Sequence, residues 1–159
     1  MAGWKTAWRS FYYDGAPEAP DPVLVKGKVA LLVIDVQNTY LARPDPDTLS
    51  PAERAREAAW DGFHERMHGT VIPTIARLIE RFRATGNRVV FARIASLTPD
   101  GADRSLSQKK PGWNDLFLPH DSEASQVVPQ LAPRPGEVVV TKTTDSALTG
   151  TNLRLLLGN

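Results

Sequence analysis

Three short apolar runs, each rich in β-branched residues, are separated by longer polar segments. They occupy residues 29–36 (VALLVIDV), 88–94 (RVVFARI) and 137–141 (EVVVT). Continuous apolar runs of this length are typical of strands that are buried on both faces of a parallel sheet. The pattern therefore predicts three such strands, in this order along the chain.

Helical signals fall between and after these runs. Ser50, Pro51 and Glu53 combine a capping box with proline at the first helical position, which predicts a helix start. A second helix is indicated by a stripe that ends before Gly86 and consists of Val71, Ile72, Ile75, Leu78, Ile79 and Phe82. We expect a short helix between residues 122 and 131, and another that begins at Asn152 and runs to Leu157.

Strands that alternate with helices predict an α/β fold: a three-layer α/β/α, Rossmann-like arrangement around a mostly parallel sheet. Such sheets usually have about five or six strands. Because only three are indicated, we expect the sheet to be incomplete at the C-terminus of this sequence.

Residues 29–159 are predicted to form this one domain, and residues 1–28 an extended, proline-rich arm in front of it. The arm carries five aromatic residues: Trp4, Trp8, Phe11, Tyr12 and Tyr13. We expect them to pack against the domain or a second subunit, with a lid over a substrate pocket as the alternative.

Composition narrows the function classes. Nineteen basic and eighteen acidic residues give a net charge of +1, so the charge balance indicates neither nucleic-acid binding nor an anionic membrane surface. The sequence contains no cysteine, which excludes disulfides and thiolate metal sites within these residues. No signal peptide or membrane-spanning run is apparent, and we expect a soluble, cytoplasmic homo-oligomer.

Two ionisable residues stand at predicted strand ends, where open α/β sheets bind ligands. Asp35 closes the first strand and Lys142 follows the third. Either residue alone is as compatible with a turn or a solvated surface position. However, Asp35 lies among apolar residues, where an unpaired carboxylate is costly, so we predict that Lys142 pairs with it.

Four further residues are candidates for lining a substrate pocket. Gln37 and Asn38 follow Asp35, and Arg93 ends the second strand. Trp113 is a candidate because loops commonly carry binding residues. Structural packing or capping remains an equal alternative for all four.

Two segments resemble the isochorismatase-like hydrolases. Residues 30–40 (ALLVIDVQNTY) are similar to the family's first-strand motif, whose Asp is catalytic. Residues 131–157 (LAPRPGEVVVTKTTDSALTGTNLRLLL) are similar to its third strand, with the Pro-Gly turn, the catalytic Lys and Ser146-Ala147 after it.

The resemblance implies hydrolysis of a C–N bond of amide or ureido type in a small molecule, without a cofactor. Asp35 would be the general base for a cysteine nucleophile, Lys142 would hold and polarise the pair, and backbone amides would form the oxyanion hole. The family's cysteine follows the next strand, beyond Asn159, so we expect the chain as given to be inactive.

Two alternatives stay open at this point. True isochorismatases lack the cysteine and use the Asp to protonate a vinyl ether. A non-catalytic fragment or pseudoenzyme that acts through association with another chain is the other possibility.

A metal site is the last candidate chemistry. Related nicotinamidases bind a metal, and here Asp61, His64 and His68 are spaced along one helical face. The family's His two residues after its Asp is absent, and we predict no metal.

Overall fold

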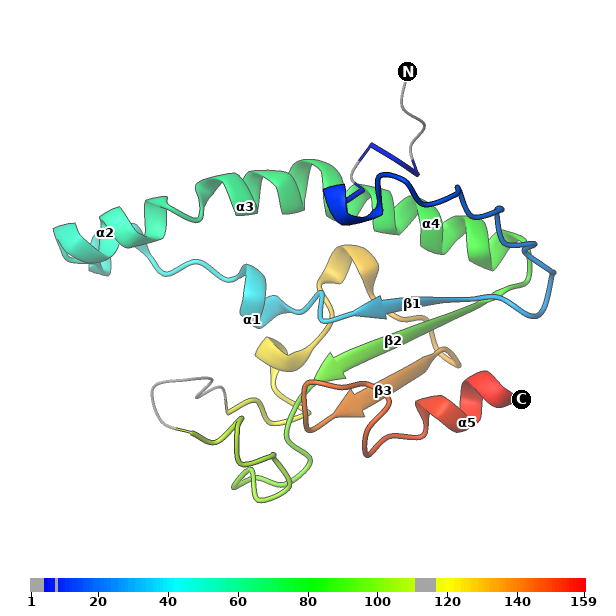
Figure 1. Cartoon of the computed structure of the whole chain (residues 1–159). Coiled ribbons are helices and arrows are strands. Elements are labelled where there is room, and N and C mark those ends of the chain that lie inside the picture. The colour runs from blue at the N-terminus through cyan, green and yellow to red at the C-terminus, as the bar shows by residue number, and fades with distance from the viewer. Residues whose placement is uncertain (1–4, 8, 111–116) are drawn as a thin grey trace.

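A parallel three-stranded sheet forms the centre of the protein. The computed structural model describes residues 5–7, 9–110 and 117–159. Strands β1 (Ala30–Ile34), β2 (Arg88–Ile94) and β3 (Val138–Lys142) lie in the order β1-β2-β3. Both pairings are parallel, with Ile34 opposite Ala92 and Ile94 opposite Lys142. The carboxyl ends of the strands therefore meet at one edge of the sheet (Figure 1).

Helices cover both faces of this sheet. On one face α4 (Ile72–Ala84) packs in a core cluster that includes Ile79, Val33 and Phe91. On the other face α5 (Leu153–Gly158) buries Leu153 against Val90 and Val140. Adjacent residues of β2 thus point to opposite helices, as the pleat of a strand requires. The predicted three-layer α/β/α architecture is confirmed.

The first strand is less buried than its apolar sequence predicts. Val33, which faces α4, is the one buried residue of β1, whereas Ile34 is 48% exposed. Ala30 and Leu32 are only partly covered, at the margin of the α5 cluster. The expectation of burial on both faces is wrong for β1 in the described residues, because α5 packs mainly on β2 and β3.

The connection from β1 to β2 is a series of helices. It comprises α1 (Asn38–Leu41), η2 (Pro46–Thr48), α2 (Pro51–Ala58), α3 (Asp61–Arg66), the π-helical turn η3 (Met67–Val71) and α4. The predicted capping box is present, since the Ser50 amide donates to Glu53 Oε2 at 2.9 Å and the Glu53 amide donates to Ser50 Oγ at 3.3 Å. α2 buries none of its residues and extends beyond the sheet (Figure 1).

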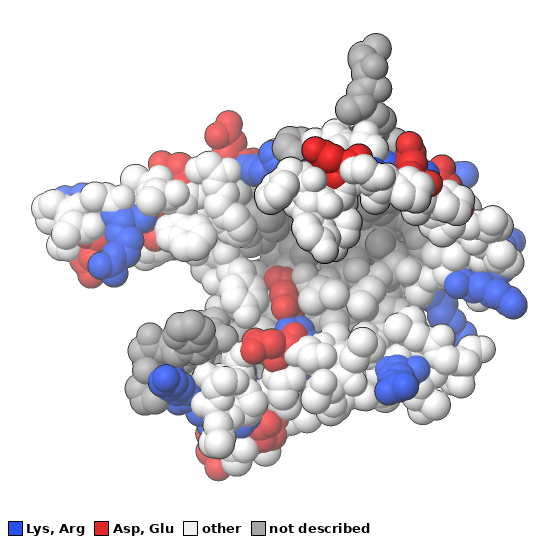
Figure 2. Space-filling view, in the orientation of Figure 1, with Lys and Arg blue, Asp and Glu red and all other residues white. Residues whose placement is uncertain are grey.

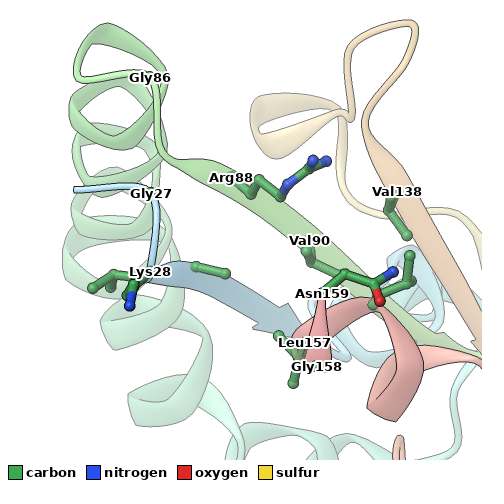
Figure 3. Close-up of a pocket in the computed structure, with 12 residues that line it drawn as sticks. Gly27, Lys28, Gly86, Arg88, Val90, Val138, Leu157, Gly158 and Asn159 are labelled. Atoms are coloured by element: carbon green, nitrogen blue, oxygen red, sulfur yellow. The ribbon is translucent and has the colours of Figure 1, made fainter. Parts of the chain in front are cut away.

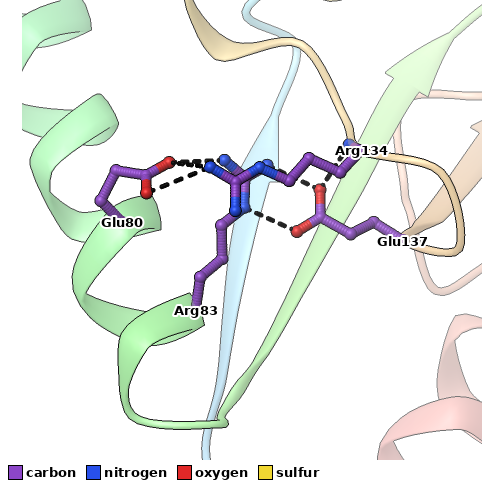
Figure 4. Close-up of polar contacts among 4 residues, drawn as sticks. All are labelled: Glu80, Arg83, Arg134 and Glu137. Atoms are coloured by element: carbon purple, nitrogen blue, oxygen red, sulfur yellow. Dashed lines mark hydrogen bonds and ion pairs between the residues drawn. The ribbon is translucent and has the colours of Figure 1, made fainter.

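The end of α4 is fixed by backbone geometry and by charge. Gly86 takes a φ of 71°, which a residue without Cβ adopts at little cost, and the chain then enters β2. Arg83 forms two hydrogen bonds to the Glu137 carboxylate, at 2.7 and 2.8 Å. Glu80 accepts from both Arg83 and Arg134 (Figure 4). This network joins α4 to the turn that precedes β3.

The short helix expected between residues 122 and 131 is replaced by two 3-10 turns, η4 (Glu123–Ser125) and η5 (Pro129–Leu131). Pro129 has no amide hydrogen and disfavours helical geometry at Val128, which is extended with ψ 144°. The Val128 amide instead donates to the Val36 carbonyl at 3.0 Å. The segment therefore packs along the chain that leaves β1.

The N-terminal arm contains one short 3-10 turn, η1 (Phe11–Tyr13). Phe11, Tyr12 and Tyr13 are 88%, 78% and 56% exposed, so they do not pack against the domain as one expectation had it. Packing onto a second subunit and a lid remain predictions. Trp4 and Trp8 lie outside the described residues.

Candidate active site

A carboxylate and an ammonium group meet at the carboxyl edge of the sheet. Lys142 Nζ lies 2.8 Å from Asp35 Oδ2, and the predicted contact is therefore present. Lys142 is 1% exposed, whereas the Asp35 side chain is 35% exposed. The buried ammonium thus holds the carboxylate of a partly exposed side chain.

Asp35 has a left-handed backbone conformation, which is uncommon among residues other than glycine. Its φ of 57° is the one positive value among the described non-glycine residues, and its amide donates to the Ala92 carbonyl at 2.9 Å. Left-handed backbone costs on the order of 1 kcal/mol and is concentrated at functional sites. This turn ends β1 at Ile34, earlier than the predicted Val36.

The second carboxylate oxygen of Asp35 is not part of the ion pair. Oδ1 is buried and has no hydrogen-bond partner among the described residues. A buried carboxylate oxygen without a donor is costly, and a substrate or nucleophile that donates a proton there would satisfy it. The arrangement suits an acid–base group that is fixed through one oxygen and reacts through the other.

Gln37 and Asn38 lie beside the pair, and their side chains bind the protein framework. Gln37 is fully buried; its amide nitrogen donates to the carbonyls of Ile94 and Ser125, and its oxygen accepts from the Ile94 amide at 2.8 Å. Asn38 Nδ2 donates to the Glu123 carbonyl at 2.8 Å. Both side chains fasten the 122–126 segment to the ends of β1 and β2.

Arg93 lies near the end of β2 and also faces this segment. Its Nη1 donates to Ser125 Oγ at 3.3 Å, while its Nε is buried without a partner among the described residues. Burial lowers the pKa of the Arg93 guanidinium, because desolvation disfavours the charged form. Trp113, the remaining candidate, lies outside the described residues.

Sequence reasoning missed a polar cluster next to Asp35. Tyr40 belongs to the strand-end motif, but Arg104, Gln108 and Asp145 lie in loops after β2 and β3, where no periodicity or spacing marks them. Burial, followed by the charge of Asp35, raises the pKa of the Tyr40 hydroxyl. Arg104 lowers that pKa and Asp145 raises it, so all three charges act on the same hydroxyl.

The molecular surface has a recess near the carboxyl edge of the sheet (Figure 2). The recess opens between the α2–α3 projection and the loops on the other side of the carboxyl edge, and acidic and basic side chains meet at its inner end (Figure 2). A separate pocket of about 700 Å³ lies at the opposite, amino end of the strands, lined by Lys28, Arg88 and the last residues of α5 (Figure 3). It contains neither Asp35 nor Lys142.

The three candidates for metal binding, Asp61, His64 and His68, contact other residues or each other. Asp61 pairs with Arg43 at 2.7 Å, and the rings of His64 and His68 stack with centroids 6.2 Å apart. Within the described ranges no group of three or more His, Cys, Asp or Glu is placed to hold a metal ion. In the same ranges, none of the helices has the length and apolar character needed to cross a membrane.

Fold and site together define an α/β protein with a carboxylate–ammonium pair at the carboxyl edge of a parallel sheet. The isochorismatase domain family model matches residues 29–159. The chain belongs to the isochorismatase family.

Individual relatives agree with this assignment. The chain is 34% identical over 98 residues to N-carbamoylsarcosine amidase from Arthrobacter, covering 55% of this chain and 34% of the relative. It is 28% identical over 140 residues to ureidoacrylate amidohydrolase RutB from Pseudomonas syringae, covering 79% of this chain and 53% of the relative. The chain thus spans between a third and about half the length of these curated relatives.

A solved structure shows the same likeness. An isochorismatase family protein from Desulfovibrio vulgaris superposes with a TM-score of 0.58 at 30% identity, over 82% of this chain and 60% of that protein.

Proposed function

We propose that this protein hydrolyses a C–N bond of amide or ureido type in a small molecule, with Asp35 and Lys142 as catalytic residues. The observation that carries the proposal is the 2.8 Å contact between them, which leaves Asp35 Oδ1 without a hydrogen-bond partner among the described residues. The names of the two curated relatives, an N-carbamoyl amidase and a ureido amidohydrolase, support the bond type.

The chemistry requires a thiol that these 159 residues do not contain. Asp35 Oδ1 accepts the thiol proton, and the thiolate attacks the substrate carbonyl carbon. The tetrahedral intermediate collapses with cleavage of the C–N bond, and the protonated Asp35 returns its proton to the leaving nitrogen. Water then attacks the thioester, with Asp35 again as the base, and releases the acid and the thiol.

Lys142 has two functions in this scheme. Its ammonium keeps Asp35 oriented through Oδ2, and its positive charge stabilises the carboxylate in a partly dry crevice. Gln37 and Asn38 hold the neighbouring segment in place, so we propose them as positioning residues. Arg93 is the candidate for contact with substrate, because its Nε lacks a partner among the described residues.

The test uses the product of the complete gene, and the nucleotide sequence after codon 159 is read first. We expect it to encode a further strand and a cysteine. Ammonia release from N-carbamoyl amino acids is then measured for the wild type and for Lys142→Ala, Asp35→Asn and the control Lys26→Ala, whose side chain is exposed on the arm.

Lys142→Ala and Asp35→Asn should lose activity by about a thousandfold or more while keeping the circular dichroism spectrum. Lys26→Ala should remain as active as the wild type. Normal turnover by Lys142→Ala would refute its catalytic role.

A second candidate is hydrolysis of a vinyl ether without any thiol, with Asp35 as the acid. It needs only a carboxyl group that can donate a proton, and Asp35 Oδ1 has no hydrogen-bond partner among the described residues. The two functions differ in product, because a ureido substrate releases ammonia whereas a vinyl ether releases a carbonyl compound and an alcohol.

A further inference from the structure

The pocket at the amino ends of the strands lies away from the catalytic pair (Figure 3). Its volume of about 700 Å³ is within the range of small-molecule sites in proteins, about 300–1,000 Å³. Open α/β sheets bind their substrates at the carboxyl edge, so a ligand in this pocket would occupy a second site. The residues that line the pocket determine which ligand fits.

Two cations line this pocket, and neither has a counter-charge. Lys28 and Arg88 are exposed, and their side chains form no ion pair within the described residues. No Asp or Glu is found among the described residues that line the pocket. Glu137, which precedes the lining residue Val138, forms an ion pair with Arg83 instead. The pocket is therefore positively charged.

The backbone holds the two cations at neighbouring positions. Arg88 pairs in the sheet with Ala30, which stands two residues after Lys28. The Gly27 amide donates to Asn87 Oδ1 at 3.0 Å, and these two residues directly precede Lys28 and Arg88. Because like charges at neighbouring positions repel each other, an anion that binds between them stabilises the folded chain.

The rest of the pocket is mainly apolar. Val90 and Val138 lie opposite each other on adjacent strands, and Leu156 packs beside them in the same cluster. Leu157, at the end of α5, is 53% exposed and also lines the pocket. An alkyl chain that covers this surface removes apolar area from water, which favours binding.

We propose that this pocket is a second binding site, which takes an amphipathic anion: a carboxylate on an alkyl chain. The carboxylate lies between Lys28 and Arg88, and the chain lies against the strand ends and α5. Charge-assisted hydrogen bonds from the ammonium and the guanidinium favour the anionic group, while the apolar lining favours the chain. The inference goes beyond the proposed function, because the pocket contains neither Asp35 nor Lys142.

Binding is measured by calorimetry on the product of the complete gene, without turnover. The probes are octanoate, 1-octanol, which has the chain without the charge, and acetate and inorganic phosphate, which have the charge without the chain. The variants are Lys28→Met and Arg88→Met, which keep an apolar stem. The control Arg56→Met removes an exposed cation from α2, and Lys142→Ala removes the cation of the catalytic pair.

The wild type and Arg56→Met should bind octanoate about tenfold or more tightly than 1-octanol, acetate or phosphate. Lys28→Met and Arg88→Met should each weaken octanoate binding by about threefold to tenfold, because one charged contact is lost. Neither variant should change the binding of 1-octanol or lower the melting temperature. Lys142→Ala should bind octanoate as the wild type does.

Several results overturn the inference. The first is a wild type that binds no octanoate, and the second is octanoate binding that neither Lys28→Met nor Arg88→Met weakens. Loss of octanoate binding in Lys142→Ala would assign this ligand to the catalytic crevice. Acetate or phosphate bound as tightly as octanoate would show a site for simple anions, in which the apolar lining has no function.

Discussion

At the scale of single residues, Asp35 is constrained both by its backbone and by its charge. The left-handed φ favours Gly, Asn or Asp at this position, and the buried Lys142 ammonium requires a negative partner. Asparagine tolerates the left-handed backbone but carries no negative charge. The substitution Asp35→Asn therefore tests the effect of the charge alone.

We expect Asp35→Asn to lower the free energy of unfolding by about 1–3 kcal/mol, less than for a fully buried pair because Asp35 is partly exposed. Adding Lys142→Met should recover most of the loss, since no ammonium is then left unpaired. Urea unfolding of the two single variants and the double variant measures this. Strictly additive losses would contradict the pairing.

Tyr40 offers a spectroscopic check on the charges of the crevice. Burial and the Asp35 charge hold its pKa above the ordinary value of 10.0. Because the pKa of Tyr40 is higher in the folded than in the unfolded state, its contribution to the free energy of unfolding is complete below pH 10. The contribution is lost as the pH rises through the folded pKa. Arg104→Met should raise the Tyr40 pKa further, and Asp145→Asn should lower it.

Ultraviolet titration of the phenolate measures these shifts, with Tyr40→Phe identifying the signal among the three tyrosines. A Tyr40 pKa that does not respond to either variant would place the charges too far from the hydroxyl.

Sequence alone located the Asp35–Lys142 contact because the ends of parallel strands converge at one edge. It did not locate Arg104 or Asp145, because both lie in loops. The paths of these loops depend on tertiary hydrogen bonds, such as the one from the Ser105 amide to the Thr143 carbonyl. Likewise, sequence alone left pocket lining and structural packing as equal alternatives for Gln37, and the structure shows its amide bound to the carbonyls of Ile94 and Ser125.

At the scale of elements, the ion-pair network of Figure 4 fixes α4 against the approach to β3. Arg83 and Glu137 have side chains that are 15% and 17% exposed. The hydrogen bonds from Arg83 lower the pKa of the Glu137 carboxyl from 4.5. Its stabilising effect is therefore complete above pH 4.5 and is lost as the pH falls through the lower folded pKa.

Glu137→Gln should lower the free energy of unfolding at neutral pH by about 1–2 kcal/mol, as expected for a partly buried charged pair. The variant should also show a weaker loss of stability between neutral and acidic pH. Chemical unfolding across this pH range measures both effects. Glu80→Gln is the control, with a smaller effect because Glu80 is 59% exposed; equal losses would contradict the argument.

The projecting helix α2 depends on its cap more than on packing, because none of its residues is buried. Ser50→Ala should destabilise α2 by about 1 kcal/mol and leave the melting temperature of the domain nearly unchanged. Hydrogen exchange of α2 amides should accelerate about fivefold relative to α4 amides. Uniform acceleration in both helices would show that α2 is part of the cooperative core.

Local signals thus predicted the elements whose determinants are local: the Ser50 cap, the α4 stripe and the second strand with its observed bounds. They were wrong for residues 122–131, where Pro129 and hydrogen bonds to the β1 exit outweigh helix propensity. The open face of β1 was also missed, because coverage depends on where α5 packs.

At the scale of the whole molecule, the described sheet ends in β1 on one side and β3 on the other. Unpaired strand edges and exposed apolar residues favour association between chains. We propose self-association of this chain through the β3 edge, in keeping with the expected homo-oligomer.

Val139, which is 39% exposed on β3, provides the test. Val139→Lys should shift sedimentation velocity profiles towards the monomer with little change in melting temperature, because charge on an edge strand opposes strand addition. Val23→Lys adds the same charge on the arm, where Val23 is 87% exposed. Dissociation by Val23→Lys alone would assign the contact to the arm instead.

The bond between Asp35 and Lys142 crosses over β2, because the two residues leave strands that are about 10 Å apart. It can form only after all three strands have assembled, and it joins segments far apart in the sequence. Its formation should therefore follow the rate-limiting step of refolding, so that Lys142→Met accelerates unfolding and barely alters the refolding rate. The contact between the two strand ends would then be among the last features that a newly made chain acquires.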